Sequence, residues 1–240
     1  MSQRKPFRGF GLGIMRRIRG TRIDEAELVI RECRELILGG VFYDVGANIG
    51  LVSEAMLPYA SRIVAIEPGP EAYASLTARL GTKATCIQAL VGPDGAERTF
   101  LTNTIASASS TSVAPGDEPA GHDYLLRTPV RAVSLDTIAR EHGLPNLIKI
   151  DVEGFELSVL DSAREVLKSK PIVVMEFNTL CLSTFGRINP RDAIDRIMAM
   201  FPRVDMITGA GRTRVTDPYH FLSENILHHG ALDNLVCSWD

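Results

Sequence analysis

The sequence of 240 residues has no long hydrophobic run, since no uninterrupted apolar stretch approaches the ~18 to 20 residues that a membrane-spanning helix requires. Its first residues, Met-Ser-Gln-Arg-Lys-Pro-Phe, lack the apolar core and the small-residue cleavage site of a secretory signal. Apolar residues make up 45% of the chain and charged residues 23%, the ordinary composition of a soluble domain. The sequence therefore predicts a soluble, cytoplasmic protein.

The chain also lacks any C-x-x-C pair, because its four cysteines are scattered at positions 33, 86, 181 and 237. This spacing argues against a zinc cage or a disulfide framework and predicts buried, reduced thiols. The sequence shows no cluster of metal ligands, and we predict no metal site. Asp151 and Glu153 could share a magnesium ion with a diol, but two carboxylates at i, i+2 are thin evidence for one.

Acidic residues are absent before Asp24, whereas seven basic residues precede it. The remaining chain holds 19 basic and 29 acidic residues, a net charge of −10. An acidic body would repel a phosphate backbone, so we expect no nucleic-acid partner. Two interpretations of the basic segment stay open, a solvated terminus or a contact with an anionic membrane or a carrier lipid.

Strand and helix patterns alternate from residue 41 onward, which is typical of parallel strands joined by helices. We expect a basic N-terminal segment with a leading helix over 1–40 and one domain over 41–240. The predicted fold class is α/β, with a mostly parallel seven-stranded sheet, helices on both faces and a small β/loop insertion near 91–134. The predicted strands are 41–45, 62–66, 84–90, 147–151, 171–177, 204–207 and 234–239, and the main predicted helices are 49–57, 70–80, 134–142 and 154–168.

A glycine-punctuated turn, Asp44-Val-Gly46-Ala47-Asn48-Ile-Gly50, follows the first predicted strand of the domain. Glycines there let a ligand approach the backbone closely. The pattern is not the G-x-G-x-x-G of dinucleotide sites, and Asp44 would repel a pyrophosphate. S-adenosylmethionine carries an ammonium and a sulfonium, so it suits an acidic turn better. A tight turn with no ligand is the alternative.

Glu67 ends the next predicted strand, where its two oxygens could accept hydrogen bonds from both hydroxyls of a ribose. A surface glutamate before Pro68 is the alternative interpretation. Ala89 and Leu90, at the end of the third predicted strand, are candidates for contact with an adenine.

Two carboxylates, Asp151 and Glu153, follow the buried strand that begins at Leu147. In methyl transfer to a hydroxyl, the protein must align donor and acceptor and help remove the hydroxyl proton, so either carboxylate could be the base. We expect one of the two to cap the following helix, so that capping and chemistry are divided between them. Glu176 and Asn178 end the next strand and are candidates for substrate binding.

The insertion contains a tract rich in small hydroxyl residues over 105–113, which includes Ser109. Such a loop could order over a polyol, or it could be mobile with no such role. Among the histidines, His122 on the insertion is the best placed to meet a substrate.

Together these segments resemble the FkbM family of S-adenosylmethionine-dependent methyltransferases over roughly residues 41–178. The resemblance implies a class I, Rossmann-like methyltransferase fold and O-methyl transfer to sugars or natural-product hydroxyls. It also implies that Asp44, Gly46, Asn48, Gly50 and Glu67 hold the donor. In that case Asp151 and Glu153 border the transferred methyl group.

Two other functions stay open at this point. A nicotinamide oxidoreductase on a similar sheet is disfavoured by the missing G-x-G-x-x-G and by Asp44. A non-catalytic module that keeps the nucleoside pocket is compatible with all of the candidate acids. A nucleobase methyltransferase is disfavoured, because Asp-Val-Glu-Gly stands where the Asn/Asp-Pro-Pro-Tyr clamp for a flipped base would lie.

Overall fold

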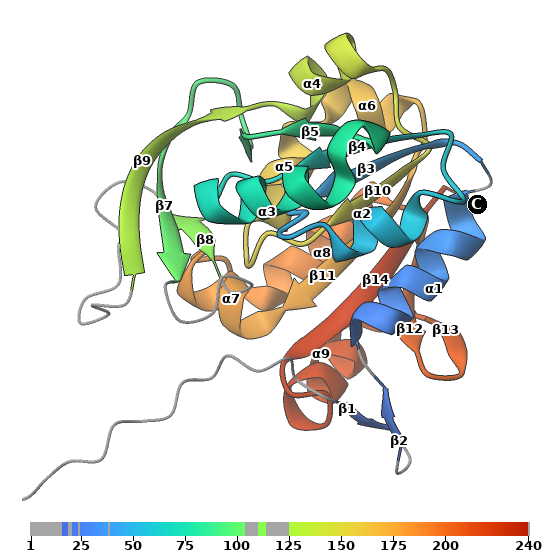
Figure 1. Ribbon diagram of the computed structural model, residues 1–240. Helices are drawn as coiled ribbons and strands as arrows, with labels where there is room; N and C mark the ends of the chain where they lie inside the picture. The colour runs from blue at the N-terminus through green and yellow to red at the C-terminus, as the bar shows by residue number, and fades with distance from the viewer. Residues whose placement is uncertain are drawn as a thin grey trace, which may run out of the picture.

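The computed structural model describes residues 16–18, 21–23, 25–37, 39–103, 110–113 and 125–239. An eight-stranded sheet forms the centre of the described chain (Figure 1). In spatial order its strands are β13 (Gly211–Arg214), β12 (Arg203–Thr208), β14 (Leu232–Ser238), β11 (Ile172–Asn178), β10 (Leu147–Ile150), β3 (Val41–Val45), β4 (Arg62–Ile66) and β5 (Thr85–Ile87).

The five strands from β11 to β5 are parallel, whereas β14, β12 and β13 are antiparallel to their neighbours. The α/β class with a mostly parallel sheet is therefore confirmed. The predicted number of seven strands is wrong by one, because β13 was missed. Its sequence, Gly-Arg-Thr-Arg, has no apolar residue, and its side chains are exposed at the edge of the sheet, so it carries no periodic signal.

Helices cover both faces of the sheet, as predicted, and each face has its own hydrophobic core. Successive residues of β3 illustrate the division, because Phe42 belongs to one core and Tyr43 to the other. The Phe42 face packs against α1 (Glu25–Ile37), α2 (Leu51–Met56) and α3 (Pro70–Leu80). The Tyr43 face packs against α4 (Leu135–His142), α5 (Glu156–Asp161), α6 (Arg164–Lys168), α7 (Thr179–Thr184), α8 (Pro190–Met200) and α9 (Pro218–Leu227).

The predicted helix over 154–168 is divided into α5 and α6. Hydrogen bonds to side chains explain the break, since the carboxylate of Asp136 accepts bonds from the backbone N–H groups of Glu165 and Val166. A carboxylate from α4 therefore satisfies the first N–H groups of α6. The break depends on a long-range contact that the local periodicity does not contain.

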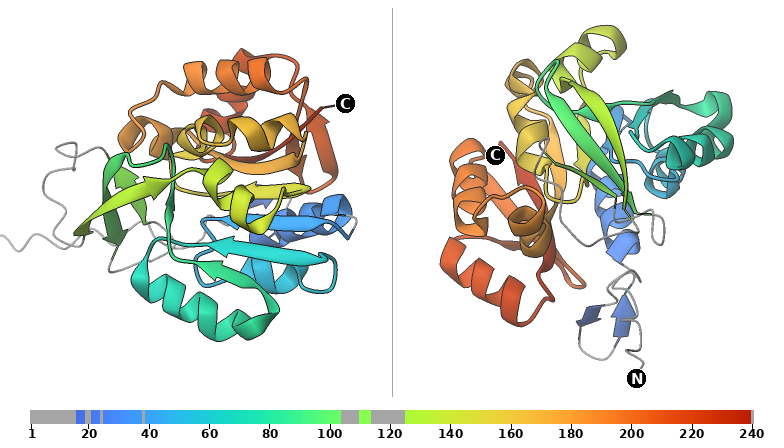
Figure 2. Two further views of the ribbon diagram at one scale, coloured as in Figure 1. Left: turned by 90° about the horizontal axis from the view of Figure 1, so that it is seen from above. Right: turned by 90° about the vertical axis from the view of Figure 1, so that its left-hand side faces the viewer.

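The predicted strand over 84–90 is also divided. After β5 and a short gap, β6 (Leu90–Val91) leaves the main sheet and pairs in parallel with β9 (Leu125–Val133). These two strands, with β7 (Glu97–Asn103) and β8 (Thr111–Val113), form a second sheet in the order β6-β9-β7-β8. Figures 1 and 2 show β7, β8 and β9 at one end of the molecule, beside α7. The predicted insertion is thus confirmed as a small β-sheet, although β8 was not predicted.

At the start of the described chain, β1 (Arg16–Ile18) and β2 (Thr21–Ile23) pair in antiparallel register. They precede α1, whose residues Leu28, Cys33 and Ile37 are buried in the core of the Phe42 face. Among the described residues, no helix is both long and apolar enough to cross a bilayer.

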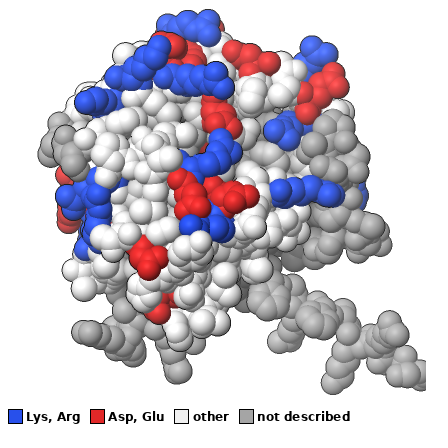
Figure 3. All heavy atoms as spheres, turned by 180° about the vertical axis from the view of Figure 1, so that it is seen from behind, with Lys and Arg blue, Asp and Glu red and all other residues white. Residues whose placement is uncertain are grey.

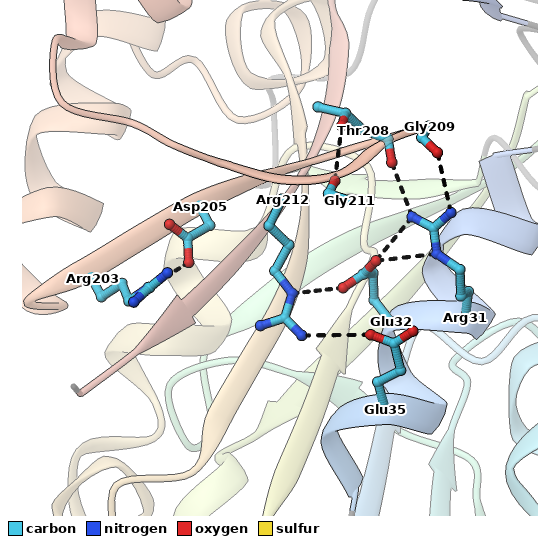
Figure 4. Close-up of polar contacts among 9 residues, drawn as sticks. All are labelled: Arg31, Glu32, Glu35, Arg203, Asp205, Thr208, Gly209, Gly211 and Arg212. Carbon is cyan, nitrogen blue, oxygen red and sulfur yellow. Dashed lines mark hydrogen bonds and ion pairs between the residues drawn. The ribbon is translucent and has the colours of Figure 1, made fainter.

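A buried glutamate on α1 fastens this helix to the β12–β13 hairpin (Figure 4). Glu32 is only 1% exposed, and its two oxygens lie 3.0 Å from Arg31 and 2.7 Å from Arg212. Arg31 also donates to the backbone carbonyls of Thr208 and Gly209. Because the arginines are partly exposed, the cluster neutralises a buried carboxylate with cations that remain hydrated.

Charged side chains elsewhere are mixed in sign. On the face shown in Figure 3, basic and acidic residues lie next to one another and form no broad field of one charge. Exposed pairs of this kind, such as Arg131 with Glu97 at 3.2 Å, contribute little to stability.

Replacing Arg212 with Met should lower the free energy of unfolding by about 2 kcal/mol, because Glu32 loses one of its two cationic partners while it stays buried. Urea denaturation measures this loss. Arg131→Met is the matched control, and its effect should stay within about 0.5 kcal/mol. Equal losses in the two variants would contradict the assignment.

Candidate active site

The candidate site lies where four parallel strands end side by side. Strand register aligns Val45 with Ile66 and with Ile150, and Ile150 with Met175. The segments that follow β3, β4, β10 and β11 therefore meet at one edge of the sheet. The structure thus brings together the predicted turn, Glu67, Asp151 with Glu153, and Glu176.

The turn after β3, residues 46–50, is closed by hydrogen bonds to the neighbouring strand. The backbone N–H groups of Gly46 and Ala47 both donate to the carbonyl of Ile66, at 3.0 Å each. Gly46 has a φ of +78°, and a Cβ there would overlap the backbone carbonyl oxygen of Asp151. Glycine is therefore required at this position, where the turn lies directly against the segment that carries the two carboxylates.

Glu67 joins the turn to the segment after β4. One carboxylate oxygen accepts from the N–H of Asn48 at 2.9 Å, and the other accepts from the N–H of Gly69 at 2.8 Å. Each oxygen can accept a second hydrogen bond, so the group can still receive two hydroxyls. Burial raises the pKa of Glu67, and the two backbone hydrogen bonds oppose that shift.

Asn48 has an unusual backbone and an orphan side-chain atom. Its φ of +49° is in the left-handed region, which asparagine tolerates better than most residues. Its Oδ1 atom is buried and accepts no hydrogen bond from the part of the chain that the structure describes. An acceptor left open beside Glu67 is consistent with a hydrogen-bonding ligand at this turn.

The remaining predicted donor contacts lie nearby. Pro68 is partly buried, and Ala47 and Gly50 are buried in the turn. Ala89 packs against the core of the Tyr43 face, and Leu90 lies in the core of the small sheet with Phe100 and Ala132. The contact of Ala89 and Leu90 with an adenine stays a prediction.

Asp44 is fully buried, and its charge is balanced within the protein. Its Oδ2 atom accepts from the hydroxyl of Ser53 at 2.7 Å, and its Oδ1 atom lies 3.3 Å from the ammonium of Lys149. Asp44 would therefore attract a cationic donor only weakly, because it is buried below the turn and Lys149 already neutralises its charge. Sequence reasoning missed Lys149, because a lysine within an apolar strand gives no motif, although an i, i+2 pair with Asp151 was a possible signal.

The segment after β10 is shaped by a second carboxylate network. Glu156 is 1% exposed, and one of its oxygens accepts from the N–H groups of Val152 and Gly154 at 3.2 and 3.1 Å. The carboxylate of Glu153 accepts from the thiol of Cys181 on α7 at 3.0 Å. Neither predicted acid caps α5, whose N-cap residue is Phe155. The predicted capping role therefore belongs to neither Asp151 nor Glu153.

Three carboxylates converge at the site. Asp151, Glu153 and Glu176 each offer an oxygen, and these oxygens lie within 4.8 Å of one another. A divalent cation could be held by such a set, and Glu176 comes from a different strand, so the sequence could not show the grouping. The absence of a metal, which the sequence predicts, stays a prediction.

The other predicted substrate contacts have different outcomes. Asn178 is an N-cap, since its side-chain oxygen accepts from the N–H groups of Leu180 and Cys181 at 3.1 Å each. Ser109 and His122 lie outside the described residues. Their contact with a substrate stays a prediction.

Strand β7 of the small sheet crosses this edge of the main sheet. The ring of Phe100 lies close to Gly69, beside Glu67. Two residues earlier, the guanidinium of Arg98 lies 4.9 Å from the ring centroid of Phe155, next to Gly154. The same strand therefore contacts the segment after β4 through Phe100 and the segment after β10 through Arg98.

A comparison with protein families matches residues 44–205 to the methyltransferase FkbM domain. The chain belongs to the FkbM methyltransferase family. The family is one of S-adenosylmethionine-dependent methyltransferases, and the doubly wound sheet of this chain is the class I methyltransferase fold.

Among curated proteins, this FkbM family member is similar to the hexuronic acid methyltransferase AglP of Haloferax volcanii, with 27% identity over 173 residues. That match covers 68% of this chain and 65% of AglP, which is just under two thirds of the relative's length.

Two solved structures are similar over most of the chain. A precorrin-6y C5,15-methyltransferase from Geobacter metallireducens is 16% identical, with a TM-score of 0.47, and the match covers 90% of this chain and 88% of that one. The O-methyltransferase TomG from Streptomyces achromogenes, in complex with S-adenosylmethionine, is 10% identical, with a TM-score of 0.45 and coverage of 90% and 80%.

Burial raises the pKa of Glu156 to about 7, from 4.5, although backbone hydrogen bonds oppose the shift. The folded protein then binds a proton that the unfolded chain has lost between these pH values, so stability should fall as pH rises through this window, by on the order of 3 kcal/mol. Glu156→Gln lacks this ionisation, and urea denaturation at pH 5 and pH 8 should show a smaller difference than in the wild type. Glu165→Gln, at an exposed position, is the control. An unchanged difference in Glu156→Gln would contradict the prediction.

Proposed function

We propose that this protein transfers a methyl group from S-adenosylmethionine to a hydroxyl of a sugar or a sugar-containing acceptor. The observation that carries the proposal is the contact between the turn after β3 and the segment after β10, where Gly46 lies against the carbonyl of Asp151. A donor at the turn and an acceptor at the carboxylates would be immediate neighbours, as group transfer requires.

The residues of the turn after β3, with Glu67 beside them, suit the donor in chemistry. Glu67 would accept hydrogen bonds from the ribose hydroxyls, since its oxygens keep acceptor capacity beside the bonds from Asn48 and Gly69. The open Oδ1 atom of Asn48 would accept from a donor group on the ligand. When bound, S-adenosylmethionine supplies a methyl group on a sulfonium, which is an excellent leaving group.

We assign the base to Asp151, because its backbone lies against Gly46 of the turn after β3. Its side chain is 42% exposed, so an acceptor hydroxyl can reach it. It would orient the hydroxyl and accept its proton as the new C–O bond forms. Glu153, whose carboxylate accepts a hydrogen bond from the thiol of Cys181, would line the space for the acceptor beside Asp151.

The relative AglP supports a sugar acceptor, since it is described as a hexuronic acid methyltransferase. A uronic acid carries a carboxylate, and β7 brings the guanidinium of Arg98 to 4.9 Å from the ring centroid of Phe155, on the segment that follows the acids. Arginine recognises carboxylates through paired hydrogen bonds. We therefore propose an acidic sugar as the first acceptor class to test.

We expect no nucleic-acid substrate, as the acidic body of the chain predicts. Contact between the basic N-terminal segment and an anionic lipid stays a proposal. Such a contact would suit a lipid-linked acceptor.

Donor binding should be visible without any acceptor. S-adenosylmethionine at about 100 times its dissociation constant should raise the melting temperature by roughly 5 to 10 °C. Glu67→Gln should reduce that shift, because the loss of the charge weakens the hydrogen bonds to the ribose. No shift in the wild type at millimolar donor would contradict the proposed function.

Turnover separates an enzyme from a nucleoside-binding module. Asp151→Asn should lower kcat by about a hundredfold or more, with the donor-induced melting shift retained. Donor consumption is followed with glucuronic acid derivatives and with matched neutral sugars, in the presence of Mg²⁺ and in the presence of EDTA. A wild type that binds the donor and methylates none of the hydroxylated acceptors would favour the module.

Arg98→Met should raise the KM for an acidic sugar by about tenfold and change the KM for its neutral counterpart little, because only the acidic acceptor loses an ionic contact. Arg131→Met, on the neighbouring strand β9, is the control. Equal changes for the two acceptors would exclude Arg98 as the residue that selects an acidic acceptor.

A further inference from the structure

We propose that Lys149 is a positioning residue for methyl transfer, because its ammonium holds the Asp151 carboxylate against the donor turn. The proposal rests on the proposed function, and it adds a residue that acts through Asp151. Lys149, which is buried in the sheet, would thereby orient the carboxylate that receives the proton of the acceptor hydroxyl.

The contacts of Lys149 join the two halves of the site. Its Nζ atom lies 3.0 Å from the carbonyl oxygen of Gly46, 3.3 Å from the Oδ1 atom of Asp44 and 3.2 Å from the Oδ2 atom of Asp151. The strand register explains the geometry, since Lys149 on β10 pairs directly with Asp44 on β3 and their side chains share a face. Asp151 follows two residues later on the same segment.

The ammonium donates a hydrogen bond to the carbonyl of Gly46, and the carboxylates of Asp44 and Asp151 are its two ion-pair partners. Lys149 is 6% exposed, so its ammonium is closed off from an acceptor molecule. Burial lowers its pKa, but the charges of Asp151 and Asp44 outweigh burial and raise it, and the side chain stays charged. Lys149 therefore orients other groups and is neither acid nor base in the reaction.

The arrangement goes beyond what burial of Asp44 alone requires. A single buried pair between Lys149 and Asp44, with Ser53 as a further donor, would satisfy the buried carboxylate. The ammonium instead also contacts a partly exposed carboxylate, Asp151, and the turn carbonyl of Gly46. One cation thus fixes the base relative to the donor turn.

The test needs a background in which Lys149 can be removed without leaving Asp44 charged and unpaired, because Lys149→Met alone would strand a buried carboxylate. The double variant Asp44→Asn/Lys149→Met is neutral at both positions, and Asp44→Asn alone is its reference. Asp151→Asn is added to each of these two backgrounds. Every variant is measured for kcat, acceptor KM and the melting shift that S-adenosylmethionine induces.

A positioning role predicts that the double variant keeps the donor-induced shift of its reference, while its kcat falls by about tenfold or more. Asp151→Asn should then cost much less in the double variant than in the Asp44→Asn reference, since Lys149 acts through Asp151. A purely structural role would lower the melting temperature of the double variant and leave the kcat of the folded protein within twofold of its reference.

Three results would overturn the proposal. These are a kcat within twofold of the reference, a parallel loss of the donor-induced shift, and an equal cost of Asp151→Asn in both backgrounds. The wild-type measurement keeps the two claims distinct. A wild type without turnover on any acceptor rejects the proposed function and, with it, the role of Lys149. A wild type with turnover leaves the proposed function standing, and the variants then decide the role of Lys149.

Discussion

The site depends on one buried cation between two carboxylates. Lys149 lies within an otherwise apolar strand, and it neutralises Asp44 in the sheet while it contacts Asp151 at the edge. A charged group is costly to bury unless its partners are close and its hydrogen bonds are satisfied. Both carboxylates lie within 3.3 Å of the ammonium, and the carbonyl of Gly46 accepts a hydrogen bond from it. The donor turn, the first parallel strand and the acceptor-side carboxylate therefore form one electrostatic unit.

The second constraint is the absence of a side chain at Gly46. The turn can approach the segment after β10 only because no Cβ is present, and its φ of +78° favours glycine as well. Glu67 then ties the same turn to the next strand through the N–H of Asn48. The proposed donor site therefore depends on backbone proximity and on the carboxylates of Asp151 and Glu67. The small β-sheet also contacts this region, since Arg98 packs on Phe155 and Phe100 lies close to Gly69.

The regular part of the fold could be predicted from the sequence, since β3, β4 and α3 have the predicted bounds and their apolar patterns are local. The edge strand β13 was missed because it has no apolar pattern, and the division of α5 from α6 depends on Asp136, a distant residue. In the site, the sequence indicated residues at strand ends, where topology brings them together. Arg98 and Cys181 could not be predicted, because their contacts come from other strands and helices, whereas Lys149 had only its i, i+2 spacing to Asp151 as a signal.

The central claim is that the methyl donor binds at the ends of β3 and β4, beside Asp151. A crystal structure of the protein with S-adenosylmethionine, or with its demethylated product, tests this claim most directly. The account predicts that both ribose hydroxyls donate to the carboxylate of Glu67 and that the sulfur faces Asp151. A ligand bound elsewhere, or one whose ribose does not contact Glu67, would contradict it.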